Sequence, residues 1–544
     1  MSIRSEARRR RLAAFYTPPD VATALVAWSV RQSTDTVLDP SFGGCVFVEA
    51  ALSALGSYGC RNPLDRVSGV DIDQHAVREA RTLGFSPQHL RSADFLRTRP
   101  ADFSTRFTAV VGNPPFVRHH ALAISKRRTA TRAIFEGGHV VRGAPAYWLY
   151  FVLHALSFLE KGGRLAFVLP GAVLTADYSE CVRSVLAQRF RETRFIAIKE
   201  RLFSDADTET VLLVADGFDE GPCDPRIHWA ESAAEATQLL RQLPPAADGI
   251  SSREHGGTWK QGLIPTDAAQ VWTKLLDSSS VHLLGDIARI RIGIVTGANS
   301  FFVLRPSQIK AHGLSRRYLR PIVQHASALG GLTITHRHIR RLARLDRACR
   351  LLVISSSCTS RSVLAYVKGK LGQAASKSFK CRERNPWYSI RDRDLAPPDA
   401  FLTYVNDSSP RLILNSADAL STNAIHRVWW RTSARAKDHP LISLSFITSL
   451  TGLAAEVWGR ACGGGALKIE PGQAEKLPVA LPEIDRGIIQ VAFRESSRRL
   501  VSKDWLGARA LADSIVLEKG LGLSAKEIVL LQQSHDQLRN MRGG

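Results

Sequence analysis

The chain has 544 residues, of which 44% are hydrophobic and 23% charged, a composition typical of a globular protein with several domains rather than of a disordered one. Its 73 lysines and arginines outnumber 50 acidic residues, and the resulting formal charge of +23 favours a polyanionic partner such as DNA or RNA over an evenly spread solubility charge. No apolar run approaches the roughly 18 residues of a membrane span and none follows the basic N-terminus, so neither a transmembrane helix, nor a membrane partner, nor a signal peptide is expected.

From residue 36 to residue 218 the chain alternates short apolar runs with amphipathic segments, the pattern of a parallel α/β sheet with helices on both faces. Strands are predicted at residues 36–39, 67–71, 89–95, 107–111, 164–169, 194–199 and 210–214. Helices are predicted over residues 46–55, 76–80 and 147–159. The last two strands are expected to form a closing pair.

Residues suited to bind a nucleoside stand at the carboxyl ends of the first three strands. Gly43 and Gly44 would let the backbone approach a ligand closely at the start of a helix. Asp71 could accept hydrogen bonds from both ribose hydroxyls, and Asp94 could accept one from an adenine amine, with Phe95 against the ring. Carboxyl ends of parallel strands share the ligand-binding edge, so these residues are expected to meet there, although each acid alone could simply cap the next helix. The Gly-x-Gly-x-x-Gly loop of NAD and FAD sites is absent.

Asn113-Pro114-Pro115-Phe116 ends the fourth strand. The exocyclic amine of a nucleobase is a poor nucleophile because its lone pair is delocalised into the ring. Methylating it requires acceptors that grip the amine hydrogens and an aromatic face against the base. The Asn113 side-chain oxygen, the rigidly held Pro114 carbonyl and the Phe116 ring would supply those parts. Taken alone, the four residues could be no more than a turn that ends a strand.

In this order the motifs resemble those of the gamma-type DNA amino-methyltransferases, the adenine-N6 modification enzymes of restriction systems. The matching segments are Tyr16-Thr17-Pro18-Pro19, Asp39-Pro40-Ser41-Phe42-Gly43-Gly44, Asp71, Asp94-Phe95 and Asn113-Pro114-Pro115-Phe116. The resemblance implies a Rossmann-like doubly wound methyltransferase sheet with an antiparallel closing strand, and S-adenosylmethionine as the cofactor. The loop departs from the family's Asp-Pro-x-Cys-Gly-Ser-Gly, because here the two glycines are adjacent and a bulky Phe42 intrudes.

The resemblance also implies roles for individual residues. Asn113, Pro114, Pro115 and Phe116 would be catalytic. The cofactor site would be formed by Tyr16, Thr17, Pro18, Asp39, Pro40, Phe42, Gly43, Asp71, Ile72, Asp94 and Phe95. Phe203 lies in a segment, residues 202–208, that resembles the family's target-base loop, and it would line the pocket for the base; as an isolated residue it could equally be an ordinary core phenylalanine. No metal ligand is expected.

Beyond residue 218 the periodicity weakens, and prolines and glycines between residues 219 and 257 predict a linker-like break. Residues 287–304 alternate apolar positions around turn signals in a hairpin-like pattern, and with residues 384–388, 462–467 and 476–482 they resemble the family's target-recognition domain. We therefore expect a catalytic, cofactor-binding domain at residues 1–245, a mixed α+β target-recognition domain at 258–483 and a helical tail at 484–544. The second is rich in arginine and aromatic residues, but no single base-reading residue stands out.

Eight cysteines show neither Cys-x-x-Cys pairs nor histidines at zinc spacing, which predicts reduced thiols in a cytoplasmic protein; the resemblance adds a bacterial or archaeal host and association with the nucleoid. Nuclease and P-loop signatures are absent, so neither a fused restriction activity nor an ATP-driven motor is expected.

The leading hypothesis is a sequence-specific methyltransferase that modifies N6 of a flipped adenine in double-stranded DNA, as the modification arm of a restriction or phage-defence system. Two alternatives stay open. One is methylation of RNA adenine or protein glutamine, because the same turn serves other planar amines and amides. The other is a catalytically weak DNA-binding relative whose cofactor loop is damaged at Phe42. The recognised sequence, a separate restriction endonuclease and the oligomeric state are left undecided.

Overall fold

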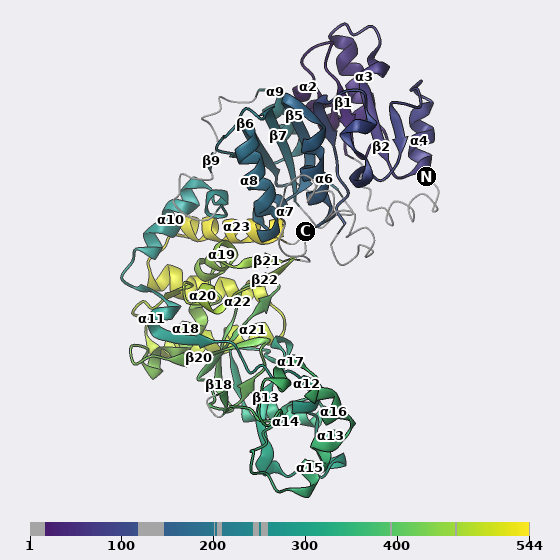
Figure 1. Ribbon diagram of the computed structural model, residues 1–544. Coiled ribbons are helices and arrows are strands. Elements are labelled where there is room, and N and C mark those ends of the chain that lie inside the picture. Colours follow the sequence, from purple (N-terminus) through teal and green to yellow (C-terminus); the bar gives the residue numbers. More distant parts are fainter. Residues whose placement is uncertain are drawn as a thin grey trace. The chain divides into compact units, whose positions relative to one another are not determined.

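The structure is a computed structural model that describes residues 17–117, 146–200, 202–203, 209–242, 250–251, 259–391, 394–462 and 465–542. The chain forms two compact units (Figure 1). The first unit comprises Met1–Pro265, Ala461–Ala466 and Asp536–Gly544, and the second comprises Thr266–Arg460 and Leu467–His535.

A nine-stranded sheet forms the centre of the first unit, in the order β3-β2-β1-β4-β5-β7-β6-β8-β9. Its strands are β1 (Val37–Asp39), β2 (Val67–Asp71), β3 (Leu90–Ser92), β4 (Phe107–Gly112), β5 (Leu159–Pro170), β6 (Phe190–Ile198), β7 (Thr210–Phe218), β8 (Arg226–Ala230) and β9 (Ile250–Ser251). The strands from β3 to β5 are parallel, and β7 runs antiparallel between β5 and β6. The predicted doubly wound sheet with an antiparallel closing strand is therefore confirmed.

Helices cover both faces of this sheet. They are α2 (Pro19–Ser29), α3 (Val46–Ser57), α4 (Gln74–Arg81), α6 (Tyr147–Ala155), α7 (Ala172–Thr175), α8 (Glu180–Arg189) and α9 (Ala233–Arg241). Side chains of α2, α3, α4 and α9 share one apolar core with alternate strand residues such as Val111 and Leu212. Successive strand residues point to opposite faces, so Val110 and Leu213 lie on the other face, and all four are fully buried.

The stretch after residue 218, predicted to be linker-like, instead extends the sheet. β8 pairs in parallel with β6, from Arg194 opposite Arg226 to Ile198 opposite Ala230, and the next helix, α9, buries Ala236 and Leu240. The prolines at positions 222 and 225 occupy the turn before β8. The prediction was wrong here because the turn residues are dense, whereas the pairing that makes β8 a strand comes from β6, about thirty residues earlier.

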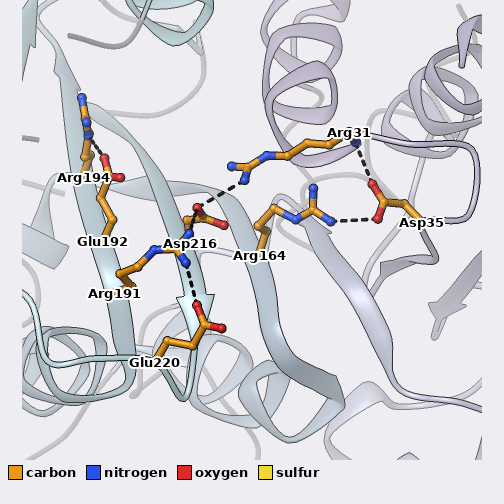
Figure 2. Close-up of polar contacts among 8 residues, drawn as sticks. All are labelled: Arg31, Asp35, Arg164, Arg191, Glu192, Arg194, Asp216 and Glu220. Carbon is orange, nitrogen blue, oxygen red and sulfur yellow. Dashed lines mark hydrogen bonds and ion pairs between the residues drawn. The ribbon is translucent and has the colours of Figure 1, made fainter. Parts of the chain in front are cut away.

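A buried ion pair fastens the segment before β1 to β5 (Figure 2). Arg164 of β5 donates to Asp35 at 2.8 Å, and the side chains are 9% and 0% exposed. Asp35 also accepts from the main-chain N–H groups of Arg31 and Gln32. Burial opposes ionisation of this carboxyl, but the N–H donors and the guanidinium hold its pKa below its usual range. The carboxylate of the pair thus accepts main-chain N–H donors as well as the guanidinium, which offsets part of the cost of burying its charge.

A second group of ion pairs joins the segment just after α2 to the neighbouring strands (Figure 2). Asp216 of β7 accepts from Arg31 at 3.3 Å and from Arg191 of β6 at 2.8 Å, and Arg191 also donates to Glu220 at 2.7 Å. Because Asp216 is near the end of the antiparallel β7, these contacts lie at the amino edge of the parallel strands. None of these ion pairs lies at the carboxyl ends of the parallel strands.

The second unit is a mixed α+β assembly, as predicted for the carboxyl half. Its sheets have the orders β11-β20-β16-β18-β14 and β12-β15-β13-β19, with β10 paired to β23 and β17 to β22. The strands are β10 (Val281–Leu283), β11 (Ala288–Arg291), β12 (Val303–Leu304), β13 (Leu319–Val323), β14 (Thr333–Thr335), β15 (Arg350–Leu352), β16 (Ala400–Thr403), β17 (Val405–Asn406), β18 (Leu412–Ser416), β19 (Leu420–Ser421), β20 (Ile425–Trp430), β22 (Ala466–Lys468) and β23 (Pro478–Ala480). The helices before residue 480 are α10 (Thr266–Leu276), α11 (Leu284–Ile287), α12 (Asn299–Phe302), α13 (Pro306–Ala311), α14 (His336–Arg344), α15 (Arg361–Lys368), α16 (Lys370–Ser376), α17 (Phe379–Arg382), α18 (His439–Ser445), α19 (Ser449–Trp458) and α20 (Pro471–Ala474).

Residues 287–304 do not form the hairpin that their alternation suggested. β11 pairs antiparallel with β20, whereas β12 pairs with β15 in the other sheet. Between them Gly293 packs so closely on the chain that an added Cβ would lie 2.0 Å from the Thr422 carbonyl oxygen. Alternation reveals which face of a strand is buried but not which partner it pairs with, so the long-range pairings could not be read locally.

The C-terminal region is helical, as predicted. It contains α21 (Arg486–Val501), α22 (Trp505–Ala512), a π-helix over Asp513–Gly520 and α23 (Ala525–Arg542). Asp513, only 1% exposed, accepts from the Ser449 N–H and Oγ at 2.7 and 2.6 Å and from Gln532 at 2.9 Å, which anchors this region within the second unit. Within the described ranges, no single helix is long and apolar enough to cross a membrane; the stretches Ala436–Ser445 and Ser449–Trp458 pass such a test only as a pair bent by 68°.

Candidate active site

The predicted site residues meet at one edge of the sheet in the first unit. β1 lies between β2 and β4, so the order of the strands reverses beside it. In open α/β sheets, ligands bind in the crevice at the carboxyl ends of the strands next to such a reversal. Asp39 ends β1, Asp71 ends β2, and Asn113 directly follows the end of β4. The loop after β1 and the Asn-Pro-Pro-Phe turn therefore come from adjacent strand ends.

Asp71 holds the loop that follows β1. Its Oδ2 accepts from the Gly43 N–H at 2.9 Å, and its Oδ1 accepts from the Asp73 N–H at 2.7 Å. Gly43 has φ of 48°, a left-handed conformation that a glycine adopts without strain. Burial raises the pKa of the Asp71 carboxyl, and the two N–H donors oppose that rise. Beside it, Ile72 is an apolar side chain that is 50% exposed.

Phe42 turns into the core instead of intruding into the loop. Its side chain is 3% exposed and belongs to the apolar core beneath α3. The space for its ring is provided by Gly69 of β2, where an added Cβ would lie 2.6 Å from Phe42 Cδ1. The departure from the family's loop is thus matched by a glycine on the neighbouring strand.

Asp39 is a carboxyl group buried under the loop, 1% exposed. Its Oδ1 accepts from the Ser41 N–H at 3.0 Å, while its Oδ2 has no hydrogen-bond partner among residues 17–117 or elsewhere in the described chain. Burial, and to a smaller extent the charge of Asp71, raise the pKa of Asp39 to about 8. Pro40 and Gly112 pack around it, and an added Cβ on Gly112 would lie 2.9 Å from Asp39 Oδ1.

Two hydroxyl groups fix Asn113. Its Nδ2 donates to Thr17 Oγ1 at 3.1 Å, and its main-chain carbonyl accepts from Ser41 Oγ at 3.2 Å. Thr17 is 5% exposed and stands just before α2, whose first turn is closed by the carbonyl of Pro18. Asn113 of the turn after β4 therefore joins two other segments, the one before α2 and the loop after β1. Tyr16, predicted to line the cofactor site, lies outside the described residues.

The rest of the turn presents a carbonyl and an aromatic ring. The Pro115 carbonyl accepts from the Val117 N–H at 3.0 Å, whereas the Pro114 carbonyl accepts no hydrogen bond within the part of the chain that the structure describes. The rings of Phe116 and Phe203 meet edge to face, with centroids 6.3 Å apart and planes at 79°. Phe203, 6% exposed, is thus brought to the Asn-Pro-Pro-Phe turn from the segment after β6.

Asp94 and Phe95 are engaged in contacts of their own. Asp94 Oδ1 accepts from the Leu96 N–H at 3.1 Å, which caps a short helical turn. Burial, followed by the charge of Asp94 and a hydrogen bond to it, raises the pKa of the Tyr147 phenol. Phe95 is 2% exposed and lies among Phe151, His154 and Phe158, with ring centroids 4.9 to 5.3 Å away. These contacts favour a packing role for the Phe95 ring over the stacking role predicted from the sequence.

Sequence reasoning missed the contributions of Ser41 and Tyr147. Ser41 stood inside a motif that was recognised, but no local signal showed that its hydroxyl would reach Asn113. Tyr147 begins the apolar helix α6 and is 6% exposed. A tyrosine in such a sequence is expected to be an ordinary core residue. Among the described residues, no group of three His, Cys, Asp or Glu side chains is placed to hold a metal ion.

The sequence of this chain is similar to those of known DNA methyltransferases. Residues 3–221 match the model of the N-6 DNA methylase family, and residues 256–517 match that of the C-terminal domain of type II methyltransferase M.Eco57I. The chain is 22% identical over 478 residues to type II methyltransferase M.AccI of Acinetobacter calcoaceticus, covering 86% of this chain and 85% of that protein. It is 23% identical over 489 residues to M.XamI of Xanthomonas campestris pv. amaranthicola, covering 87% and 86%. The fold is similar to that of the type IIG restriction endonuclease BpuSI, with a TM-score of 0.51 and 14% identity over 99% of this chain and 67% of that one.

Proposed function

Because the chain is an adenine-N6 DNA methyltransferase of the restriction-modification type, we propose that the residues at the carboxyl ends of β1, β2 and β4 bind S-adenosylmethionine and transfer its methyl group to an adenine flipped out of duplex DNA. The observation that carries the assignment is the placement of Asn113, which is hydrogen-bonded to Thr17 and to Ser41 of the loop after β1.

Asn113 and Pro114 act on the adenine amine. Since Thr17 Oγ1 accepts from Asn113 Nδ2, the side-chain atom that remains for an amine hydrogen is the acceptor Oδ1. The Pro114 carbonyl, rigid between two proline rings, is the second acceptor. Hydrogen bonds from both amine hydrogens make N6 more tetrahedral and its lone pair more available. These bonds strengthen as the amine rehybridises, so they stabilise the transition state more than the ground state.

Phe116 and Phe203 form the aromatic wall of the base pocket. Their edge-to-face contact is a preferred geometry for two rings, and it fixes both against each other. A flipped base that stacks on one of them is held flat, with its amine toward Asn113. This supports the role predicted for Phe203 at the target base.

The loop after β1 suits a nucleoside cofactor that carries a positive charge. S-adenosylmethionine supplies, when bound, an electrophilic methyl group on a sulfonium. Asp71 has one N–H donor on each carboxylate oxygen and keeps lone pairs for two ribose hydroxyls. The half-exposed Ile72 offers an apolar surface to a purine ring, and the left-handed Gly43 leaves the backbone open to close approach. Asp39, buried beneath this loop, sets its shape through Ser41.

The experiment is transfer of a radiolabelled methyl group from S-adenosylmethionine to a DNA of diverse sequence, followed by identification of the methylated nucleoside. Wild-type protein should label adenine at N6. Asn113→Ala should lose at least about 100-fold in turnover while cofactor and DNA affinity change little, because the loss belongs mainly to the transition state. Retention of more than about a tenth of wild-type turnover by this variant would contradict the role of Asn113.

The same assay separates the other substrates that the turn could serve. RNA, protein and DNA are offered together, and label is expected in DNA alone. The chain acts as the modification arm of a restriction system in this proposal, with the cognate endonuclease a separate protein. Label in RNA or in protein glutamine would replace the DNA assignment, while bound cofactor without transfer would favour a binding protein.

A further inference from the structure

A cavity of about 430 Å³ lies in the second unit, at one edge of the four-stranded sheet. Arg305 follows β12, Gln324 and His325 follow β13, and Arg347 precedes β15; all four line the cavity. β15 runs antiparallel to both β12 and β13, so these positions meet at the same edge. The pairing of three short strands thus brings together side chains more than forty residues apart in sequence.

The lining is basic. Arg305, His325 and Arg347 are exposed, and no carboxylate of the described residues lies within ion-pair distance of either arginine. The acid next in sequence to Arg347, Asp346, is held by Ser307, whose Oγ and N–H donate to it at 2.6 and 2.9 Å. These donors hold the pKa of Asp346 below its usual range, with a smaller contribution from the charge of Arg305. The cavity therefore has two permanently charged guanidinium groups and an imidazole, and the one carboxylate beside it is already hydrogen-bonded to Ser307.

Helix α14 extends the basic surface from the wall of the cavity. Leu342 of this helix lines the cavity, and Ile339 is its buried anchor. Its exposed residues include Arg337, Arg340, Arg341 and Arg344, and it contains no acidic residue. Arginines three and four positions apart share one side of a helix. Such a row of like charges destabilises the isolated helix, and a bound polyanion would relieve the repulsion between the arginines.

We propose that this cavity, which shares no residue with the site of methyl transfer, binds a phosphodiester group of the DNA backbone. The inference rests on the proposed function, which makes DNA the substrate. Arg305 and Arg347 supply charged N–H donors, and Gln324 and Ser327 supply neutral ones. A phosphate group alone would not fill a cavity of this size, which leaves room for the attached sugar. Contacts of this kind position the protein on the duplex without reading its sequence.

The test measures binding of a fixed non-cognate DNA duplex over a range of salt concentrations, without cofactor. The double variant Arg305→Gln/Arg347→Gln should bind about 10-fold more weakly at low salt and should lower the slope of log affinity against log salt by about 1, the value for one lost phosphate contact. Arg305→Lys/Arg347→Lys should keep most of the slope, because a lysine still neutralises a phosphate as a point charge.

The matched control is Arg494→Gln/Lys526→Gln, which removes two exposed positive charges from the same unit, from α21 and α23. It should change affinity by no more than about 2-fold and leave the slope unaltered. Inorganic phosphate, added at constant ionic strength, should compete with DNA on the wild type and not on the glutamine variant. Equal slopes for the cavity variant and the control would overturn the proposal, and so would phosphate binding at the cavity without any effect on DNA. Because no methyl transfer is measured, a wild type that binds DNA through the cavity yet transfers no methyl would refute the proposed function alone.

Discussion

Ser41 Oγ donates a 3.2 Å hydrogen bond to the main-chain carbonyl of Asn113. One residue of the loop that follows β1 thereby contacts the backbone of the Asn-Pro-Pro-Phe turn, to which we assign the target amine. The same serine donates its N–H to Asp39, so its position is fixed from below. A change in the loop after β1 should therefore alter the position of the turn directly.

Ser41→Ala should lower kcat by about 3- to 10-fold with a smaller change in KM for S-adenosylmethionine. This range corresponds to one neutral hydrogen bond of about 0.5–1.5 kcal/mol. Ser41→Thr, which keeps the hydroxyl, should restore most of the turnover. Steady-state kinetics checks the split. Equal losses in Ser41→Ala and Ser41→Thr would mean that packing, not the hydrogen bond, is what matters at this position.

Asp71→Ala should weaken S-adenosylmethionine binding by about 2–4 kcal/mol, because charge-assisted bonds to the ribose and the bond to the Gly43 N–H are lost together. Calorimetry with the full-length protein measures the affinity. DNA affinity without cofactor serves as the control and should not change. A cofactor affinity within about 3-fold of wild type would remove Asp71 from the cofactor site.

Gly69→Ala should destabilise the first unit by about 1–3 kcal/mol, because the new methyl group would overlap the Phe42 ring and press on Leu90. Urea unfolding checks this. Gly56→Ala in α3, where the added Cβ would meet no atom within 4 Å apart from its chain neighbours and the backbone of its own helix, is the matched control and should be neutral or slightly stabilising. In the double variant Gly69→Ala/Phe42→Leu the two effects should not add, since they concern one contact. Strict additivity would show that the two side chains do not compete for this space.

Asp39 makes stability depend on pH in a defined direction. Its pKa is raised to about 8 in the folded protein, so between about pH 4 and pH 8 the folded state keeps a proton that the unfolded chain has lost. Stability from this group is therefore lost as pH rises through that window. Asp39→Asn should flatten the fall in unfolding free energy between about pH 5 and pH 8. It should not abolish the fall, because burial also raises the pKa of Glu209 to about 8. Parallel curves for wild type and variant would contradict the assignment.

The parallel strands of the first unit were predictable because a strand buried on both faces has a short, continuous apolar sequence. Several of them also end at an acidic residue or at the Asn-Pro-Pro-Phe motif. The arrangement of the site was less accessible. That Thr17 reaches Asn113 across 96 residues, or that Phe42 lies on Gly69, depends on side-chain directions that no spacing reveals. β8 and the separation of β11 from β12 were missed because their partners are distant in sequence, and the same distance hid the cavity at Arg305 and Arg347.

The composition of the first unit limits how the specificity of such an enzyme could be exchanged. Its segments are Met1–Pro265, Ala461–Ala466 and Asp536–Gly544, so the end of the chain returns to the sheet where the chain began. Met541 is fully buried there, and its carbonyl accepts from the Thr175 hydroxyl at 3.5 Å. Grafting a new target-recognition region by a single cut near residue 265 would strip the catalytic unit of this terminal segment. A functional chimera needs a matched junction at every point where the chain passes from one unit to the other. The two units are therefore expected to evolve together rather than to be exchanged as independent domains.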